Sequence, residues 1–259
     1  MADKKCKLIV IDGLDGSGKA TQTKLLCKRL SEMGCKARTI SFPDYESDSS
    51  ALVRMYLGGK LGSSPNDVNA YAASTFYAVD RVASYINAWR ADYGSYDYII
   101  ADRYTTSNII HQMAKVTESE RDSYIEWLFD FEYNRLELPA PDMVIFLDVD
   151  PAISQKLIEG RYDGDESKKD IHESDVAYLL RCRNSAVYAI DHLGWVRIDC
   201  TKDGEMRTIE EINDEIISLL QNGDTNDKTV FRLPLEKVPP LGECPKDKGG
   251  AASGEEAAT

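Results

Sequence analysis

A glycine-rich segment near the beginning of the chain has the residue types and the spacing of a phosphate-binding loop. It reads G-L-D-G-S-G-K between an apolar run and a helical pattern, which fits the P-loop pattern G-x-x-x-x-G-K. Glycines let backbone N–H groups surround a phosphate, and the following helix adds the positive end of its dipole. The residues expected to bind the phosphates of a nucleoside triphosphate are Gly13, Leu14, Asp15, Gly16, Ser17, Gly18, Lys19, Ala20 and Thr21.

The residue after the loop lysine departs from the usual pattern. P-loops place a Ser or Thr there as a Mg²⁺ ligand, but this chain has Ala20, followed by Thr21. Ala20 cannot ligate a metal, and Thr21 lies about 100° further around the helix. Because Mg²⁺ tends to rely on carboxylates, waters and substrate phosphates, we expect Asp15 and Asp102 to hold it, directly or through water.

Two short motifs further along the chain carry groups that could bind an acceptor. Asp102-Arg103-Tyr104 directly follows an apolar run, and ligands of open parallel sheets bind beyond the carboxyl ends of the strands. In the segment F-Y-A-V-D-R at 76–81, an aromatic residue lies four positions before an arginine, and therefore on the same helix face. A structural ion pair and a core aromatic are the simpler interpretations of these motifs.

A polar, charged stretch at 161–170 between two helical patterns has the composition of a lid that closes over phosphates. Such a lid needs mobile basic groups that arrive only when substrate is bound, and a solvated loop would look the same. The chain lacks the N-K-x-D motif with which GTPases recognise their base. Together the segments favour a kinase of small nucleotides, which needs two phosphate sites and a lid.

The elements that must position these motifs alternate along the chain. Apolar runs predict strands at Lys7–Asp12, Ala37–Phe42, Asp97–Ala101, Met143–Leu147 and Trp195–Ile198. Helical patterns lie at 19–33, 50–57, 66–92, 104–134, 151–159, 172–192 and 207–221. Because such alternation produces right-handed βαβ crossovers, we expect an α/β fold of three layers, a P-loop kinase fold with a five-stranded parallel sheet flanked by helices.

Composition bounds the organisation of the chain and its partners. Residues 1–221 are expected to form the kinase domain, with a lid at about 160–171, and residues 222–259 a partly disordered tail that holds four of the nine prolines. The net charge of −13 argues against nucleic acid or a membrane surface as partner. No apolar stretch is long enough for a transmembrane helix. Six cysteines without a C-x-x-C pair suit free thiols, so we expect a cytoplasmic protein.

Taken together, these segments resemble the thymidylate kinase family from about Lys7 to Gln221. The resemblance rests on G-L-D-G-S-G-K, F-P-D-Y at 42–45, F-Y-A-V-D-R at 76–81, D-R-Y-T-T-S-N-I-I-H-Q at 102–112 and D-I-H-E at 170–173, in this order. It implies Mg²⁺-dependent transfer of the γ-phosphoryl group of ATP to dTMP, giving dTDP. It also implies a homodimer.

The resemblance further implies which residues contact the base of dTMP. Phe42 and Pro43 match part of the nucleoside pocket, and Tyr77 stands where the family usually has a phenylalanine stacked on thymine. Asn108 and Gln112, four apart on one helix face, match positions that read the thymine edge.

Charged residues match the family's contacts to sugar, phosphates and metal. Asp15 resembles the contact to the deoxyribose 3′-OH close to Mg²⁺, and Arg54 an arginine at the acceptor phosphate. Arg81 is similar to the residue that spans base edge and phosphate. Asp102 resembles the carboxylate near Mg²⁺, and Arg103 a clamp on the transferring and accepting phosphates.

Two positions vary within the family and bear on mechanism. His111 stands where many members have a tyrosine near the sugar. Some members carry a catalytic arginine in the P-loop, and others carry it in the lid. Gly16 occupies the loop position here, so the chain resembles the lid-arginine class. The candidate for this arginine is Arg161, with Lys168 and Lys169 as alternatives. The expected catalytic residues are Lys19, Asp102, Arg103 and Arg161.

Two other functions remain compatible with the sequence. A kinase for another pyrimidine nucleotide, such as dUMP, would need the same loop and lid. A weakly active nucleotide-binding module is suggested by Ala20, although Lys19, Asp15, Asp102 and both arginines argue against it.

Overall fold

The computed structural model describes residues 6–150, 153–154, 157, 170–173 and 175–222. Its central element is a parallel sheet with the strand order β2-β3-β1-β4-β5, as expected of an α/β P-loop kinase fold. The strands are β1 (Lys7–Gly13), β2 (Ala37–Ser41), β3 (Tyr98–Asp102), β4 (Met143–Asp148) and β5 (Val196–Asp199). Each begins and ends within one residue of the range that its apolar run predicts.

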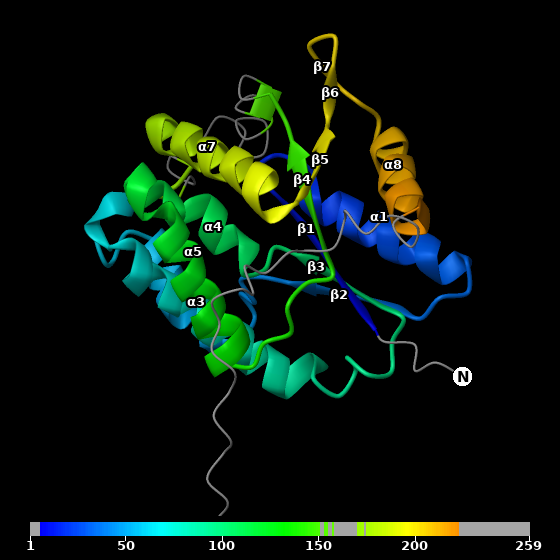
Figure 1. Cartoon of the computed structure of the whole chain (residues 1–259), viewed down its shortest axis with the longest axis horizontal. Helices are drawn as coiled ribbons and strands as arrows, with labels where there is room; N and C mark the ends of the chain where they lie inside the picture. Colours follow the sequence, from blue (N-terminus) through cyan, green and yellow to red (C-terminus); the bar gives the residue numbers. More distant parts are fainter. Residues whose placement is uncertain (1–5, 151–152, 155–156, 158–169, 174, 223–259) are drawn as a thin grey trace, which may run out of the picture.

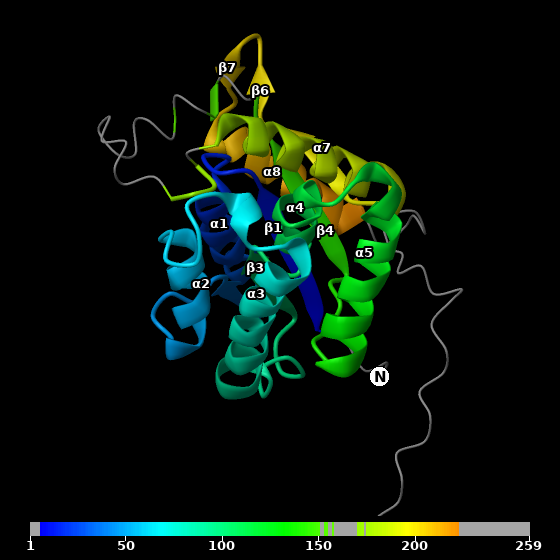
Figure 2. The same ribbon diagram turned by 90° about the vertical axis from the view of Figure 1, so that its left-hand side faces the viewer.

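Helices cover both faces of the sheet and complete three layers (Figures 1 and 2). One face packs on α1 (Lys19–Glu32) and α8 (Ile209–Asn222), and the other on α3 (Ala70–Ser84), α4 (Thr106–His111), α5 (Arg121–Phe129) and α7 (Val176–Leu193). A short helix, α2 (Ala51–Leu57), contacts α3.

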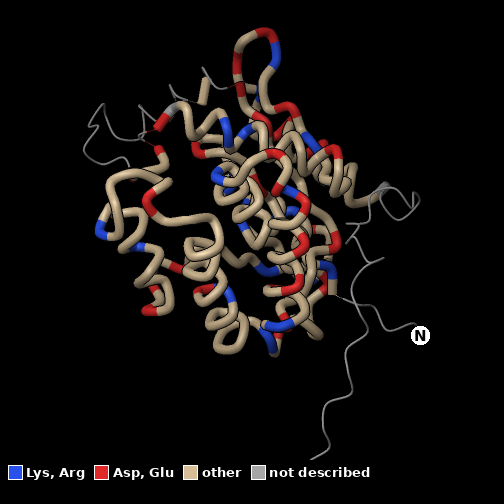
Figure 3. The backbone as a smooth tube through the Cα atoms, turned by 60° about the vertical axis from the view of Figure 1, so that its left-hand side comes forward, with Lys and Arg blue, Asp and Glu red and all other residues tan. Residues whose placement is uncertain are grey.

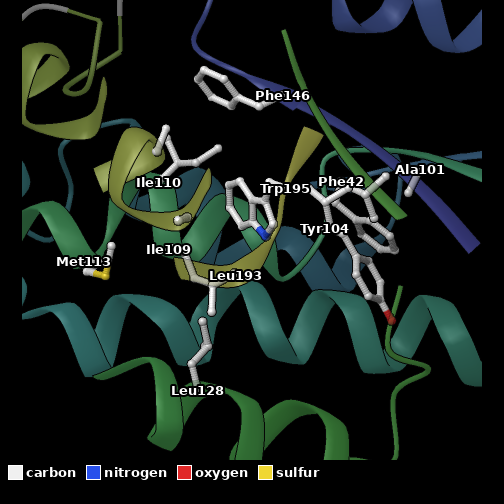
Figure 4. Close-up of a cluster of buried hydrophobic side chains, with 14 of the residues drawn as sticks. Phe42, Ala101, Tyr104, Ile109, Ile110, Met113, Leu128, Phe146, Leu193 and Trp195 are labelled. Atoms are coloured by element: carbon white, nitrogen blue, oxygen red, sulfur yellow. The ribbon is translucent and has the colours of Figure 1, made fainter. Parts of the chain in front are cut away.

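The apolar runs form strands because successive side chains enter opposite layers. In β1, Leu8 and Val10 belong to the core under α4, α5 and α7, whereas Ile9 and Ile11 belong to the core under α1 and α8. A parallel sheet buried on both faces needs this continuous apolar sequence. Figure 4 shows part of the larger core, where the rings of Tyr104 and Phe42 lie side by side, 5.8 Å between their centres.

The sequence prediction is wrong for the segment 104–134, which is not one helix. The chain leaves the helical conformation at Val116, which is extended, and Thr117 then starts a new helical stretch with Glu120 in a capping box. A capping box satisfies N–H groups that a new helix start leaves free. Both α3 and α5 end in π-helical turns, Tyr85–Trp89 and Asp130–Arg135.

Other boundaries differ less. The pattern at 66–92 begins in a 3-10 turn, Pro65–Asp67, and becomes α-helical only from Ala70, after Asn69, which caps α3. A small antiparallel hairpin at Thr201–Lys202 and Glu205–Met206, which was not predicted, precedes α8. The tail and most of the segments expected as a helix at 151–159 and a lid lie outside the described residues.

Charged side chains are mixed along the surface. Figure 3 shows Lys and Arg interspersed with Asp and Glu over the described chain. None of the described helices is long and apolar enough to cross a membrane.

Candidate active site

The loop between β1 and α1 is closely packed, and two of its glycines are needed for its shape. A Cβ on Gly13 would lie 2.8 Å from the carbonyl oxygen of Leu147, so a larger residue does not fit without a shift. Gly18, at the N-cap of α1, has a left-handed backbone with φ 84°, which glycine adopts without steric cost. Lys19 Nζ donates to the carbonyl oxygen of Leu14 at 2.7 Å, so the lysine side chain lies over its own loop.

Arg103, the residue after β3, connects this loop to α4. Its backbone is left-handed, with φ 66°, a conformation that costs a residue with a Cβ about 1–2 kcal/mol. One terminal nitrogen donates to Asp15 Oδ1 at 2.5 Å, and the other lies 3.2 Å from His111 Nε2. Because a guanidinium only donates, Nε2 accepts this bond and the neutral imidazole of His111 carries its proton on Nδ1.

Asp12 is a buried carboxylate near the end of β1 that fixes the start of α4. It accepts hydrogen bonds from Thr106 Oγ1 at 2.6 Å, Ser107 Oγ at 2.9 Å and the backbone N–H of Gly13 at 2.9 Å. Its Oδ1 lies 3.8 Å from the Arg103 guanidinium. One carboxylate therefore links the phosphate loop, the helix and the arginine.

Opposite charges keep the groups of this site ionised although they are buried. Burial alone would raise the pKa of Asp15, but the positive charges of Arg103 and Lys19 hold it well below its usual value. Burial and the nearby Arg103 lower the pKa of Lys19 to about 8, against the attraction of Asp15. Burial raises the pKa of Asp102, opposed by the same two cations.

Two adjoining pockets lie at the carboxyl edge of the sheet. The first has a volume of about 520 Å³ and reaches between α3 and α4, and the second, of about 1210 Å³, borders the phosphate loop. The residues that line both are Asp15, Phe42, Pro43, Tyr45, Arg103 and Asp170. A molecule in either pocket would therefore meet the pair of Asp15 and Arg103.

The residues that build these pockets lie within a segment that matches a known family. The sequence model described as thymidylate kinase matches residues 11–216. The chain belongs to the thymidylate kinase family. This finding confirms the resemblance seen in the sequence motifs.

Individual relatives agree with the family assignment. The thymidylate kinase of Mycobacterium tuberculosis is 32% identical over 191 residues, which cover 73% of this chain and 87% of the relative. That of Schizosaccharomyces pombe is 27% identical over 217 residues, which cover 83% and 92%.

Solved structures of the family share the fold. The thymidylate kinase of Candida albicans, described as having broad substrate specificity, aligns with a TM-score of 0.62 at 21% identity, over 88% of this chain and 98% of that chain. The thymidylate kinase of Ehrlichia chaffeensis gives 0.56 at 20% identity, over 84% and 100%.

Most residues expected to bind the thymidylate kinase acceptor gather in the first pocket, although their roles stay predictions. Those that line it are Asp15, Phe42, Pro43, Tyr77, Arg81, Arg103, Asn108, His111 and Gln112. The second pocket is lined by further expected residues, namely Gly16, Gly18, Lys19, Ala20, Thr21 and Asp102. Gly13, Leu14 and Ser17 shape the loop but do not line either pocket.

Arg54 is the expected acceptor residue that lies elsewhere. It is exposed, and one guanidinium nitrogen donates to the backbone oxygens of Tyr45 and Ser47, each at 3.0 Å. It therefore braces the segment that carries Tyr45 and does not line the pocket. The lid candidates Arg161, Lys168 and Lys169 lie outside the described residues.

Several pocket residues were missed by the sequence analysis. They are Tyr45, Leu57, Tyr104, Ser107, Asp170 and His172. Tyr45 ends F-P-D-Y, Tyr104 and Ser107 lie in D-R-Y-T-T-S-N-I-I-H-Q, and Asp170 and His172 belong to D-I-H-E. The motifs that carried the resemblance could therefore have indicated five of them.

The D-I-H-E segment forms an anchored turn against the first pocket. Asp170 Oδ1 accepts from the backbone N–H groups of His172 at 2.8 Å and Glu173 at 2.9 Å. His172 Nε2 lies 2.9 Å from the Tyr56 hydroxyl. Burial raises the pKa of Asp170 to about 6 and lowers that of His172 to about 3, so the imidazole adds no charge at neutral pH.

Replacement of Gly13 tests the close packing of the phosphate loop. We expect Gly13→Ala to lower the free energy of unfolding by about 1–3 kcal/mol, because its Cβ meets a backbone oxygen that cannot move freely. Urea denaturation measures the change. Gly94→Ala is the control, since an added Cβ at Gly94 has nothing within 4 Å and the backbone there is not left-handed. Equal costs for both variants would contradict a steric role for Gly13.

Proposed function

We propose that this thymidylate kinase family member transfers the γ-phosphoryl group of ATP to dTMP in a Mg²⁺-dependent reaction. The observation that carries the proposal is the junction of the two pockets at Asp15 and Arg103. A triphosphate on the loop beside Lys19 and a nucleoside monophosphate in the first pocket would bring their phosphates together at this junction. The family membership and the thymidylate kinase relatives support the choice of dTMP.

The first pocket suits a pyrimidine. Tyr77 lines it, and burial keeps the pKa of its phenol well above the usual value, so a neutral ring is available to stack on a base. Asn108 and Gln112 are buried polar residues of the same wall. Neither terminal atom of Gln112 has a hydrogen-bond partner within the described part of the chain, which leaves both for a ligand.

The second pocket offers carboxylates suited to Mg²⁺. Asp15, Asp102, Asp170 and Glu173 line it opposite Lys19, although no three metal-binding side chains cluster within the described residues. Mg²⁺ usually takes one or two carboxylates with waters and phosphate oxygens, so Asp102 and Asp15 fit this requirement without the hydroxyl that Ala20 lacks. Bound Mg²⁺ would neutralise charge on the phosphate oxygens.

The remaining chemistry needs alignment more than acid–base catalysis. The acceptor phosphate oxygen is already a nucleophile at neutral pH, so positioning and charge neutralisation dominate. Lys19 and Arg103 would neutralise charge from the loop and from β3. The lid arginine, for which Arg161 is the candidate, would add a third cation and help to exclude water.

Acceptor choice tests the proposed function directly. With ATP and Mg²⁺, we expect dTMP to exceed dCMP, dAMP and dGMP in kcat/KM by at least about tenfold for each hydrogen bond that a wrong base leaves unmade. The loss of one methyl makes dUMP a poorer but measurable substrate. ADP release across this panel, with EDTA as the metal-free control, measures these ratios.

Other outcomes identify the alternatives. A preference for dUMP would favour a kinase for another pyrimidine nucleotide. Binding of ATP without turnover of any acceptor would favour a nucleotide-binding module.

The lowered pKa of Lys19 predicts how triphosphate binding depends on pH. Lys19 loses its proton in the free protein above about pH 8, and a neutral amine attracts phosphate less. We expect the Kd of a non-hydrolysable ATP analogue to rise only about twofold between pH 7 and 8 and then by up to about tenfold per pH unit. Calorimetry measures this, and Lys19→Arg, which stays protonated, is the control without the rise. A Kd that stays constant to pH 9.5 in the parent protein is the contrary result.

We also propose a homodimer, built on α2 and α3. These two helices contact each other and expose Leu52, Met55 and Val79, and the π-helical turn that follows α3 exposes Ile86. Contact with a second copy would remove them from water. We expect Ile86→Glu to shift the protein to monomer in sedimentation velocity, whereas Leu180→Glu on α7, equally a new charge at an exposed apolar site, leaves the state unchanged. A dimer that survives Ile86→Glu points to another surface.

A further inference from the structure

Glu132 is a fully buried carboxylate behind the wall of the first pocket. It lies in the π-helical turn after α5, with 0% of its surface exposed, and it does not line the pocket itself. It accepts two hydrogen bonds from Arg81, at 2.7 and 2.5 Å, one from Thr105 Oγ1 at 2.8 Å and one from Asn108 Nδ2 at 3.1 Å. Two of these partners, Arg81 and Asn108, do line the pocket.

The contacts of Asn108 fix which end of its amide can meet a ligand. The nitrogen Nδ2 faces Glu132 and also the backbone oxygen of Ser74 at 3.4 Å. Both of these groups accept here, since each oxygen of Glu132 already takes an N–H from Arg81 and the Ser74 group is a carbonyl oxygen. The amide therefore cannot turn over without two repulsive contacts. Its oxygen, which has no hydrogen-bond partner among the described residues, is left as an acceptor for the pocket.

The Glu132 carboxylate also fixes the guanidinium of Arg81, which is the neighbouring donor in the pocket wall. Arg81 gives Glu132 its Nε–H and one N–H of a terminal nitrogen, and its other terminal nitrogen lies 3.4 Å from the Tyr104 carbonyl oxygen. Of the five guanidinium N–H groups, these contacts leave two for a ligand. Arg81 is 1% exposed, so without Glu132 it would be an unpaired buried charge.

Arg81 and Asn108 together therefore present N–H groups beside an amide oxygen to the pocket. Thymine and uracil carry the complementary pair, a carbonyl oxygen beside the N3–H group. Cytosine carries the opposite pair, an amino group beside an N3 atom that accepts. A cytosine in this position would set donor against donor and acceptor against acceptor.

We propose that Glu132 is the positioning residue that makes the pocket select thymine and uracil over cytosine. It acts by fixing the orientation of Asn108 and the open N–H groups of Arg81. The proposal rests on the proposed function, since it assumes that the first pocket holds the base of the acceptor. Glu132 itself touches no substrate, and its effect is on selectivity.

The variant Glu132→Gln removes this control with little change in shape. The new amide has one N–H₂ end, which must face a donor of Arg81 whichever way it turns. In one orientation the N–H₂ group of the new glutamine also faces Asn108 Nδ2. Because two donors repel, the Asn108 amide then turns over and places its own nitrogen toward the pocket. We expect the ratio of kcat/KM for dTMP to that for dCMP to fall by at least about tenfold, mainly through a higher KM for dTMP.

A matched control separates selectivity from stability. Asp148 is a buried carboxylate that pairs with two arginines, Arg183 at 2.8 Å and Arg197 at 2.7 Å, and it lines neither pocket. Asp148→Asn makes the same chemical change at another buried carboxylate held by arginine. We expect both variants to lower the melting temperature, and only Glu132→Gln to change the acceptor ratio. An unchanged ratio in folded Glu132→Gln, or an equal change in Asp148→Asn, would overturn the proposal.

A double variant gives a rescue that a purely structural role does not predict. In Glu132→Gln with Asn108→Asp, the new amide nitrogen can donate to the new carboxylate, which presents an oxygen to the pocket whichever way it turns. We expect the preference for dTMP over dCMP to return to within about threefold of the parent. A folded double variant without that preference would contradict the proposal. This test holds even if the single variant Glu132→Gln does not fold.

Measurements on the parent protein separate a failure of the proposed function from a failure of the proposed role of Glu132. If the parent itself shows no preference for dTMP over dCMP, the proposed function fails and the role of Glu132 falls with it. If the parent shows the preference and folded Glu132→Gln keeps it, only the role of Glu132 fails.

Discussion

The ion pair between Arg103 and Asp15 is the contact on which the site depends. β1 and β3 are neighbouring parallel strands, so the residues that follow them emerge at the same edge of the sheet. Asp15 comes from the loop after β1 and Arg103 from the residue after β3, and their side chains meet at 2.5 Å. Removal of either partner would leave a largely buried charge unpaired, which typically costs about 3–5 kcal/mol. The left-handed backbone of Arg103 is a cost that this pairing offsets.

Several carboxylates of the sequence motifs hold the walls of the site without facing the pocket. Asp80, for example, accepts from the Asp44 backbone N–H at 2.8 Å and from Ser49 Oγ at 2.7 Å, and so holds the segment after Phe42. The next residue, Arg81, faces Glu132 instead. Adjacent residues of one helical turn thus fix two different walls of the same pocket. Exchange of Asp80 for a neutral residue would therefore loosen the pocket without removing a lining side chain, whereas Arg81 also lines the pocket itself.

The sequence predicted the sheet and the phosphate loop because both depend on local patterns. A strand such as β4 is buried along its whole length, which requires an unbroken apolar run, and the loop requires glycine at Gly13 and Gly18 for reasons of space and backbone angle. Glu132 shows where prediction ends. It lies in the segment D-F-E-Y-N-R, in which a glutamate is ordinarily solvated, and only the packing of α5 against α3 and α4 brings it to Arg81 and Asn108. Arg54 was assigned a ligand from the family resemblance, but its guanidinium donates to the Ser50 hydroxyl and to backbone oxygens of Tyr45 and Ser47.

The unmade hydrogen bonds of the pocket connect stability with recognition. Gln112 is 1% exposed and His111 is 6% exposed, yet both amide atoms of Gln112 and Nδ1 of His111 lack a partner within the described residues. Each buried polar atom left in this way typically costs about 1–3 kcal/mol. These three atoms belong to adjacent residues that line the first pocket, so their cost falls on one wall of it. A ligand that supplies the missing partners recovers part of it on binding, whereas one with its donors and acceptors reversed recovers nothing and adds repulsion. In the proposed function, the pocket would therefore discriminate by what it leaves unsatisfied as much as by what it contacts.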